Sequence, residues 1–129
     1  MNKTEEVKTN KAPNALGPYS QAVTTNGFVF CSGQIPLDSK TGELIGDSIK
    51  EQTNQVIQNL KAVLEEAGSS LKQVVKTEVF LTDLKNFVEF NEAYTKQFTF
   101  TPKPARFTVG VNQLPKDALV EISCVATLK

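Results

Sequence analysis

An arginine and a glutamate stand among apolar residues in two strand-like segments near the C-terminal end of the chain. Arg106 opens the segment 106–111, and Glu121 lies inside the segment 120–128. Successive side chains of a strand point to opposite faces, so Arg106 and Thr108 share one face of the first segment. If the apolar face of the sheet lies under helices, we expect Arg106 and Glu121 to project together from the other face. Such a pair forms either a salt bridge or a small-molecule site, and the pattern alone favours the salt bridge because most such pairs are structural.

The composition restricts the chemistry that these residues could perform. The chain has no histidine, which excludes a Ser-His or Cys-His nucleophilic pair, an imidazole base and a histidine-containing metal site. Lys plus Arg and Asp plus Glu both number 14, so no overall charge steers the protein towards nucleic acid or an anionic membrane. Cys31 and Cys124 lie in apolar strand-like runs, and we interpret them as buried free thiols rather than as a disulfide or a nucleophile.

The length of 129 residues predicts a single domain spanning 1–129, large enough to bury a core. The first eleven residues are polar, contain Glu5 and Glu6, and lack the apolar segment of a signal peptide. No apolar run approaches the length of a membrane span, and two cysteines without a signal peptide suggest a reducing compartment. We therefore expect a soluble cytoplasmic protein with no membrane partner. The acidic residues near the start argue against mitochondrial placement.

Two segments carry helix signals. Ser48 and Glu51 have the spacing of a capping box, and Gly68 stands where a left-handed residue ends a helix. Apolar residues between them repeat at helical spacing, which predicts a helix that covers something on one face only. Asn86 and Glu89 have the same capping spacing and predict the start of a second helix. Its expected buried stripe consists of Phe87, Phe90, Tyr94 and Phe98.

Strand-like segments surround the two helices, which gives an α+β order of strands, helix, strand, helix and strands. The run 28–33 is apolar enough to predict a strand buried on both faces. Two helices can cover only one face of a sheet of about five or six strands. The uncovered face carries semi-apolar residues such as Val125 and Thr127. We therefore expect a closed homo-oligomer that buries this face, with sites between subunits.

Several short blocks stand in a fixed order along the chain. They are GPYSQA at 17–22, SGQIP at 32–36, PAR at 104–106, LPK at 114–116 and VEI at 120–122. In these blocks the chain resembles the Rid (YjgF) family, and most of all its RidA group of reactive-intermediate deaminases. The resemblance implies a chorismate-mutase-like α+β fold, with two helices packed on one face of a sheet of about six strands. It also implies a homotrimer with a cleft between each pair of neighbouring subunits.

The resemblance also implies an activity, the hydrolysis of 2-imino acids to 2-oxo acids and ammonia without a metal or cofactor. These imines form from enamines such as 2-aminoacrylate and 2-aminocrotonate, which pyridoxal-phosphate-dependent dehydratases release. Arg106 matches the family's carboxylate-binding position, where a guanidinium offers two parallel hydrogen bonds. Glu121 matches the family's glutamate and could orient water or accept its proton. A partly desolvated cleft would raise its pKa towards the operating pH.

Further positions match the family's pocket. Tyr19 matches a tyrosine that closes over the ligand, and Ser32 and Asn91 match residues that donate hydrogen bonds. Gly33 would let the backbone approach a ligand, and Thr108 stands where many relatives carry Cys or Thr, so the chemistry needs no thiol. The residues alone leave a structural interpretation open for each. Tyr19 could simply pack near a turn, and Gly33 could mark a bulge.

Phe107 departs from the family pattern, because relatives mostly have a small residue there. By strand alternation it points away from Arg106 and Thr108, and we expect it to lie on the helix side. On this interpretation Phe107 changes the packing of the core and leaves the pocket intact.

Two other functions compete with deamination. Relatives have been described as endoribonucleases and translation inhibitors, but zero net charge and the absence of histidine argue against RNA as the main partner. A basic patch formed only in a trimer would reverse that judgement. The third interpretation is a non-catalytic module that senses a small imino or oxo acid, or a chaperone-like surface. The presence of Glu121 favours catalysis over sensing alone.

Overall fold

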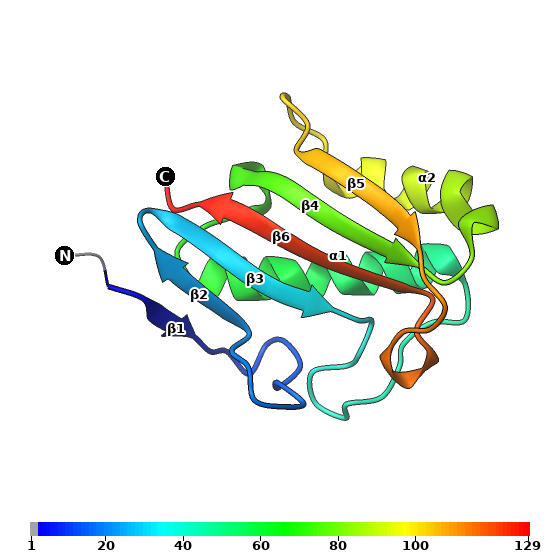
Figure 1. The fold of residues 1–129 in the computed structure, drawn as a ribbon, viewed down its shortest axis with the longest axis horizontal. Coiled ribbons are helices and arrows are strands. Elements are labelled where there is room, and N and C mark those ends of the chain that lie inside the picture. Colours follow the sequence, from blue (N-terminus) through cyan, green and yellow to red (C-terminus); the bar gives the residue numbers. More distant parts are fainter. Residues whose placement is uncertain (1–2) are drawn as a thin grey trace.

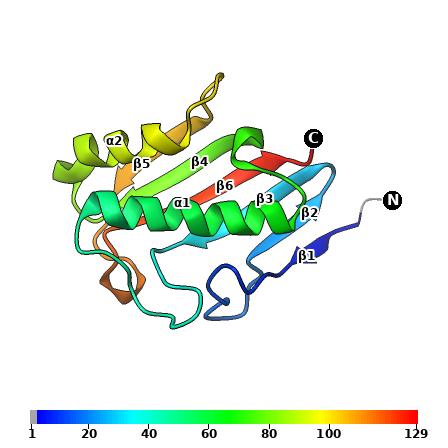
Figure 2. The same ribbon diagram turned by 180° about the vertical axis from the view of Figure 1, so that it is seen from behind.

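A computed structural model describes residues 3–129 as one six-stranded sheet with two helices. The strands lie in the order β1-β2-β3-β6-β4-β5; β4 and β5 run parallel and all other neighbours are antiparallel. Both helices lie on the same face of the sheet (Figures 1 and 2). The predicted α+β fold is confirmed. The elements are β1 (Glu5–Val7), β2 (Ala22–Thr25), β3 (Phe28–Gln34), α1 (Ile49–Glu66), β4 (Val74–Leu81), α2 (Phe87–Gln97), β5 (Ala105–Gly110) and β6 (Val120–Thr127).

The first helix, α1, has the termini that its sequence predicts. Ser48 Oγ accepts a hydrogen bond from Glu51 N at 3.2 Å, and Glu51 Oε1 accepts one from Ser48 N at 3.2 Å. This reciprocal pair satisfies backbone donors that the helix itself leaves free. Gly68 follows the helix with φ of +88°, a conformation that L side chains rarely adopt. The side chains of Val56, Leu60 and Leu64 are fully buried, so the helix packs one face against the sheet.

The second helix, α2, begins where expected but with a different cap. Asn86 makes no side-chain capping hydrogen bond, so that part of the prediction is wrong. A short 3₁₀ turn at Leu84–Asn86 precedes the helix, and Asp83 accepts a hydrogen bond from Lys85 N at its start. Phe90, Tyr94 and Phe98 are buried as predicted, whereas the Phe87 side chain is 39% exposed. Apart from Phe87, the aromatic stripe is therefore a core feature.

Only one face of the sheet is covered, and the strands alternate accordingly. In β6 the residues on the helix face, Val120, Ile122, Cys124 and Ala126, are all buried. In β3 Val29 and Cys31 are buried, but Phe28 and Phe30 are 39% and 43% exposed on the opposite face. In a single copy β3 is therefore buried on one face only, because no element of residues 3–129 covers the second face, which is the face that the expected oligomer would bury. Cys31 and Cys124 are confirmed as buried free thiols.

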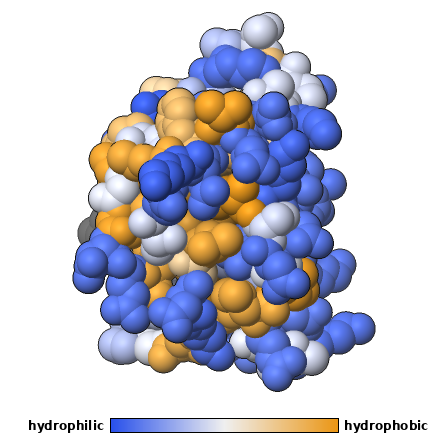
Figure 3. Space-filling view, turned by 90° about the vertical axis from the view of Figure 1, so that its right-hand side faces the viewer, coloured by the Kyte–Doolittle hydropathy of each residue, from blue (hydrophilic) through white to orange (hydrophobic). Residues whose placement is uncertain are grey.

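Exposed apolar side chains also gather at one end of the molecule. The side of the molecule near the beginning of α2 and the carboxyl end of β5 shows broad apolar areas broken by polar side chains (Figure 3). Leu84, Phe87 and Val88 are 52%, 39% and 67% exposed there. Within residues 3–129, neither helix is long and apolar enough to cross a membrane.

Candidate functional site

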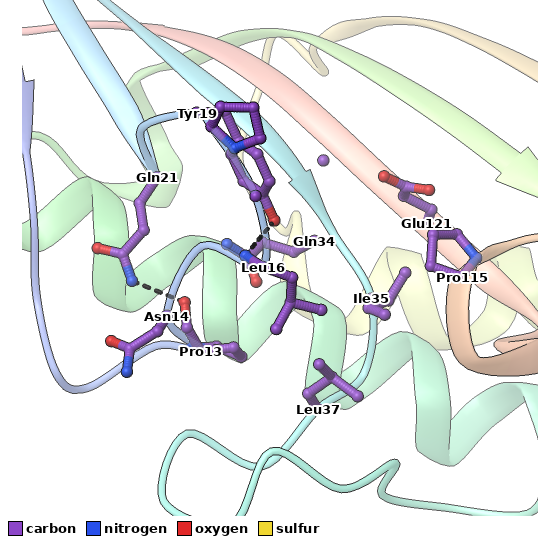
Figure 4. Close-up of a pocket in the computed structure, with 13 residues that line it drawn as sticks. Pro13, Asn14, Leu16, Tyr19, Gln21, Gln34, Ile35, Leu37, Pro115 and Glu121 are labelled. Carbon is purple, nitrogen blue, oxygen red and sulfur yellow. Dashed lines mark hydrogen bonds between the residues drawn. The ribbon is translucent and has the colours of Figure 1, made fainter.

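A pocket of about 250 Å³ lies beside the end of β3 and brings together three of the predicted site residues. Tyr19 comes from the loop before β2, Gly33 from β3 and Glu121 from β6 (Figure 4). Most of the remaining wall is apolar, so a charged group inside it is partly shielded from water. The apolar lining consists of Pro13, Leu16, Pro18, Ile35, Leu37 and Pro115.

Gly33 lies directly against the Glu121 carboxylate. The register between β3 and β6 shifts between Cys31 and Gln34, so Gly33 lies in a β-bulge. A Cβ on residue 33 would overlap Glu121 Oε2 and lie 2.9 Å from its Cδ. Both sequence interpretations of this glycine are therefore partly right. It forms a bulge, and it allows a close approach, here by the carboxylate of Glu121.

The Glu121 carboxyl is half-buried and carries a perturbed pKa. Burial raises the pKa of this carboxyl above its ordinary value, and no other group shifts it. No Lys or Arg of residues 3–129 lies within ion-pair distance, since the ion pairs there join Lys50 to Glu92 and Lys76 to Glu78. The salt bridge that the sequence pattern favoured is therefore absent. A desolvated carboxylate with a raised pKa is a suitable acceptor for a proton from water.

Tyr19 lies at the pocket with its ring 49% exposed. Its hydroxyl oxygen accepts a hydrogen bond from Leu16 N at 3.1 Å, and its own N donates to Gly17 O at 2.8 Å. The hydroxyl proton stays available for a ligand, because the observed bond uses only the oxygen as acceptor. Tyr19 therefore packs in a turn and also lines the pocket, so its structural interpretation does not exclude a role in ligand binding.

Gln21 holds this loop in place, a role that the sequence reasoning missed. Its side chain is 4% exposed and bonds the main chain on both sides of the loop (Figure 4). Gln21 Oε1 accepts from Thr9 N at 2.8 Å, and Nε2 donates to Pro13 O at 2.8 Å. A buried amide must satisfy its donors and acceptors, so it fixes the surrounding backbone. In the sequence, only the position of Gln21 in the 17–22 block, just before β2, indicated that this residue matters.

Ser32 belongs to the same support and does not line the pocket. Its Oγ donates to Ser20 O at 2.6 Å, and its N donates to Gln21 O at 3.0 Å. These bonds attach β3 to the segment that carries Tyr19. Ser32 is therefore absent from the lining of this pocket in a single copy, where its hydroxyl donates to a main-chain carbonyl, and its predicted hydrogen bond to a ligand stays a prediction.

Arg106 lies on the helix side of the sheet, away from this pocket. Its Cζ lies 4.8 Å from the ring centre of Tyr94, 5.5 Å from that of Phe90 and 5.8 Å from that of Phe87. In register it neighbours Thr77, which is fully buried beneath α2. The prediction that Arg106 and Glu121 share a face is wrong. The alternation was correct, but the guanidinium is attracted by aromatic ring faces and lies against α2.

Two polar atoms near Arg106 lack hydrogen-bond partners. Asn91 Oδ1 and Thr108 Oγ1 are both buried and unpartnered within residues 3–129. Thr108 lies two residues along β5 on the face of Arg106, and Asn91 lies on α2 between Phe87 and Tyr94. Buried polar atoms normally find a partner, so these two atoms and a guanidinium without an ion pair mark a place where a polar ligand could bind.

Phe107 lies on the open face and not on the helix side. Its ring centre is 5.8 Å from that of Phe80 in an edge-on arrangement, and Lys76 Nζ is 5.7 Å from it. The expected core position is wrong because Arg106 occupies the helix side. Phe107 does point away from Arg106, as expected, and it does not line the pocket at Glu121.

The fold and the residue pattern have clear relatives among known proteins. The family described as Endoribonuclease L-PSP matches residues 9–128. The chain belongs to this family. A RutC family protein of Pyrococcus abyssi is 52% identical over 122 residues, covering 95% of both chains. Reactive Intermediate Deaminase A, chloroplastic, of Arabidopsis thaliana is 47% identical over 126 residues, or 98% of this chain and 67% of the relative. The solved structure of E. coli TdcF with bound serine is 39% identical, with a TM-score of 0.89 over 95% of this chain and 98% of the other.

Membership of the L-PSP family confirms the resemblance drawn from the short sequence blocks. The names within the family point in two directions, because the family description states an endoribonuclease and the Arabidopsis relative is named a deaminase. Relatives of this family thus support a role in deaminating reactive intermediates as the general function. The residues that would perform it here fall into two clusters. Tyr19, Gly33 and Glu121 line one pocket. The second cluster is on the helix side of the sheet, with Arg106 and Thr108 on β5 and Asn91 on α2.

Proposed function

We propose that the protein is a 2-imino acid deaminase whose substrate binds between two copies of the chain. The observation that carries the proposal is the chemistry of the two clusters. One holds a guanidinium without an ion pair beside two unpartnered polar atoms, and the other holds a half-buried carboxyl with a raised pKa. A 2-imino acid needs both, one for its carboxylate and one for the water that attacks the C=N carbon.

The separation of the clusters makes a second copy necessary. Arg106 points towards α2, and Glu121 points from the opposite face of the sheet. In a 2-imino acid the carboxylate is bonded directly to the C=N carbon, so one chain cannot place both residues against the same substrate molecule. The uncovered face also exposes Phe28, Phe30 and Val109, which association would bury. These features support the homotrimer that the family resemblance implies. In it, Arg106 of one copy would face Glu121 of the next.

The proposed reaction begins with the carboxylate. Arg106 would hold it through two parallel N–H···O bonds, Thr108 Oγ1 would donate to the same carboxylate, and Asn91 Oδ1 would accept from the N–H group of the substrate. A lysine at position 106 would supply the positive charge but not the two parallel N–H donors of a guanidinium. The C=N carbon would then enter the pocket of the neighbouring copy, with the substrate's side chain against the apolar wall formed by Leu16 and Ile35.

Glu121 would position the attacking water. As the water oxygen bonds to the imine carbon, the C=N π pair moves to nitrogen, and Glu121 accepts a proton from the water and passes it to that nitrogen. Glu121 then transfers the hydroxyl proton of the carbinolamine to nitrogen, the C–N bond breaks, the C=O bond forms, and ammonia leaves. One imine and one water thus give one 2-oxo acid and one ammonia, with no redox step and no required cofactor. The Tyr19 hydroxyl is placed to donate to the developing oxygen or nitrogen.

One observation favours the nucleic-acid alternative. Lys72, Lys103 and Lys129 line a second, shallower pocket together, and none of them lies within ion-pair distance of an acidic side chain of residues 3–129. Phosphate groups would be attracted there. Salt-dependent RNA cleavage that is lost on replacing these lysines, in a protein without deaminase activity, would make this the main function.

A coupled assay tests the proposal. A threonine dehydratase generates the imine, semicarbazide competes for it, and 2-oxobutanoate formation is followed with wild type and with Arg106→Ala. We expect acceleration by wild type alone. No acceleration by folded wild-type protein would leave the binding-module and RNA alternatives.

A further inference from the structure

We propose that three aromatic residues of α2, namely Phe87, Phe90 and Tyr94, form a cage that orients the Arg106 guanidinium, with Tyr94 as the main positioning residue. These residues would act through Arg106 and would not touch the substrate. The consequence for catalysis rests on the proposed function, but the cage itself does not.

The cage follows from the spacing of the three rings along one helix. Residues three, four and seven apart share a face of a helix, so Phe87, Phe90 and Tyr94 present their rings together. All three ring centres lie between 4.8 and 5.8 Å from Arg106 Cζ. A guanidinium at such distances from ring centres is attracted by the negative ring faces. Three rings around one cation restrict its position far more than a single contact would.

Tyr94 is the fixed member of the cage. Its hydroxyl is 2.8 Å from Thr77 Oγ1 in a buried hydrogen bond, and its ring stacks on Phe98 at 4.5 Å. Thr77 is the residue of β4 that lies beside Arg106 in register. The bond therefore connects α2 to the strand next to Arg106. Burial raises the pKa of the Tyr94 phenol, so the ring stays neutral and does not act as a counter-ion.

The cage holds the Arg106 guanidinium without a carboxylate partner. A half-buried arginine is usually paired with a carboxylate, and that partner would occupy the N–H groups that a substrate needs. Phe87 and Phe90 attract the cation but offer no hydrogen-bond acceptor. Tyr94 offers its hydroxyl oxygen as an acceptor to one N–H group. The guanidinium is thus held in place while its remaining N–H groups stay available, and an incoming carboxylate displaces no internal anion.

A spectroscopic test needs no substrate, because Arg106 is the only arginine of the chain. Its Nε–Hε group therefore gives a single assignable NMR signal. We expect a ¹⁵Nε order parameter near the rigid value of about 0.85 in wild type, and below about 0.6 in Phe87→Leu. Phe87 is 39% exposed, so this change costs little packing. Phe87→Tyr keeps a ring and should restore the rigid value.

Phe100→Leu is the matched control. Phe100 continues the same aromatic row through Phe98, at 6.0 Å between ring centres, but makes no contact with the Arg106 guanidinium. The same Phe-to-Leu change there should leave the Nε signal rigid. A loss of rigidity in Phe100→Leu equal to that in Phe87→Leu would overturn the cage, because the effect would then be general to the aromatic core.

Kinetics separate a positioning role from a structural one. Tyr94→Phe keeps the ring and removes the bond to Thr77, so we expect KM to rise about three- to tenfold while kcat stays within about twofold. A fall in kcat at constant KM would overturn the positioning role. A mobile Nε in wild type, or an Nε unaffected by Phe87→Leu and Tyr94→Phe, would overturn the cage whatever the activity. A rigid Nε that these changes release, in a protein without deaminase activity, would confirm the cage and reject the proposed function.

Discussion

Arg106 and Glu121 project from opposite faces of the same sheet. Arg106 lies beneath the rings of α2, and Glu121 lies against Gly33 at the pocket on the other side. The sequence places the two residues on neighbouring segments and suggests one surface. In the proposed function each of them is therefore half of a site that two copies complete.

Replacing Arg106 should abolish deamination without unfolding the protein. Arg106→Ala would remove the two proposed charge-assisted hydrogen bonds to the substrate, so we expect kcat/KM to fall about 10²- to 10⁴-fold. Arg106 lies half-buried on the edge strand β5 and makes no ion pair in residues 3–129, so the variant should stay folded. Its melting temperature should fall only by the loss of the contacts with the three rings of α2. Arg106→Lys is the matched control that keeps the charge and loses the fork. Full activity of Arg106→Ala would refute the carboxylate assignment.

Glu121→Gln should bind but not turn over. The amide fills the same space and cannot accept a proton, so we expect kcat to fall about 10²- to 10⁴-fold. The affinity for the product 2-oxobutanoate, measured by titration calorimetry, should stay close to that of wild type. An unchanged kcat would mean that another group handles the water.

The same substitution should stabilise the fold at neutral pH. Burial raises the Glu121 pKa, so between the unfolded and folded values the native state binds more protons than the unfolded state. Stability contributed by this group is therefore present at low pH and is lost as pH rises through the folded pKa. Thermal melts should show Glu121→Gln above wild type at pH 7, with the difference vanishing below the ordinary glutamate pKa. A lower melting temperature of the variant at pH 7 would contradict the burial.

Gly33→Ala should displace the Glu121 carboxylate. The added Cβ would overlap Oε2 and lie 2.9 Å from Cδ, so the carboxylate must rotate away. We expect kcat to fall towards that of Glu121→Gln while 2-oxo acid binding persists. Gly17→Ala is a control in the same pocket, because its Cβ would lie 3.7 Å from the nearest Tyr19 atom, an ordinary contact. Equal loss in both variants would show that the pocket tolerates no change and would remove the specific role of Gly33.

Imines derived from serine and from threonine should both be accepted. The apolar wall of the pocket at Leu16, Ile35 and Leu37 offers no polar group that would select a short or a long side chain. We expect kcat/KM values of the same order for 2-iminopropanoate and 2-iminobutanoate in the coupled assay. Activity confined to bulky substrates would contradict the assignment of this wall.

Local signals in the sequence predicted most of the fold. The capping box at Ser48, the terminal Gly68 and the alternation of β6 each depend on residues close in the chain, and each was confirmed. The cap at Asn86 failed because a 3₁₀ turn capped by Asp83 precedes α2. Local spacing alone does not distinguish these two ways of starting a helix.

The candidate site was predictable in its residues and not in its geometry. Alternation placed Arg106 opposite Phe107 correctly, yet which of the two faces α2 depends on the tertiary packing of aromatic rings. A charged residue is expected to avoid the helix side, and here attraction to three rings reverses that rule. Tertiary packing also decides the roles of Ser32, which was expected to line the pocket, and of Gln21, for which no role was expected. Both side chains hydrogen-bond the main chain and support the loop that carries Tyr19. Their partners are main-chain groups of a loop that has no periodic pattern.

Mixing two inactive variants tests most directly that each site joins two copies. Arg106→Ala and Glu121→Gln are denatured together in equal amounts, refolded, and assayed for 2-oxobutanoate formation against each variant refolded alone. If Arg106 of one copy works with Glu121 of the next, about a quarter of the clefts in randomly mixed oligomers carry both native residues. We therefore expect the mixture to recover about a quarter of wild-type activity. Recovery would be absent, despite proven subunit exchange, if both residues served the substrate from the same chain, and that result would contradict the two-copy site.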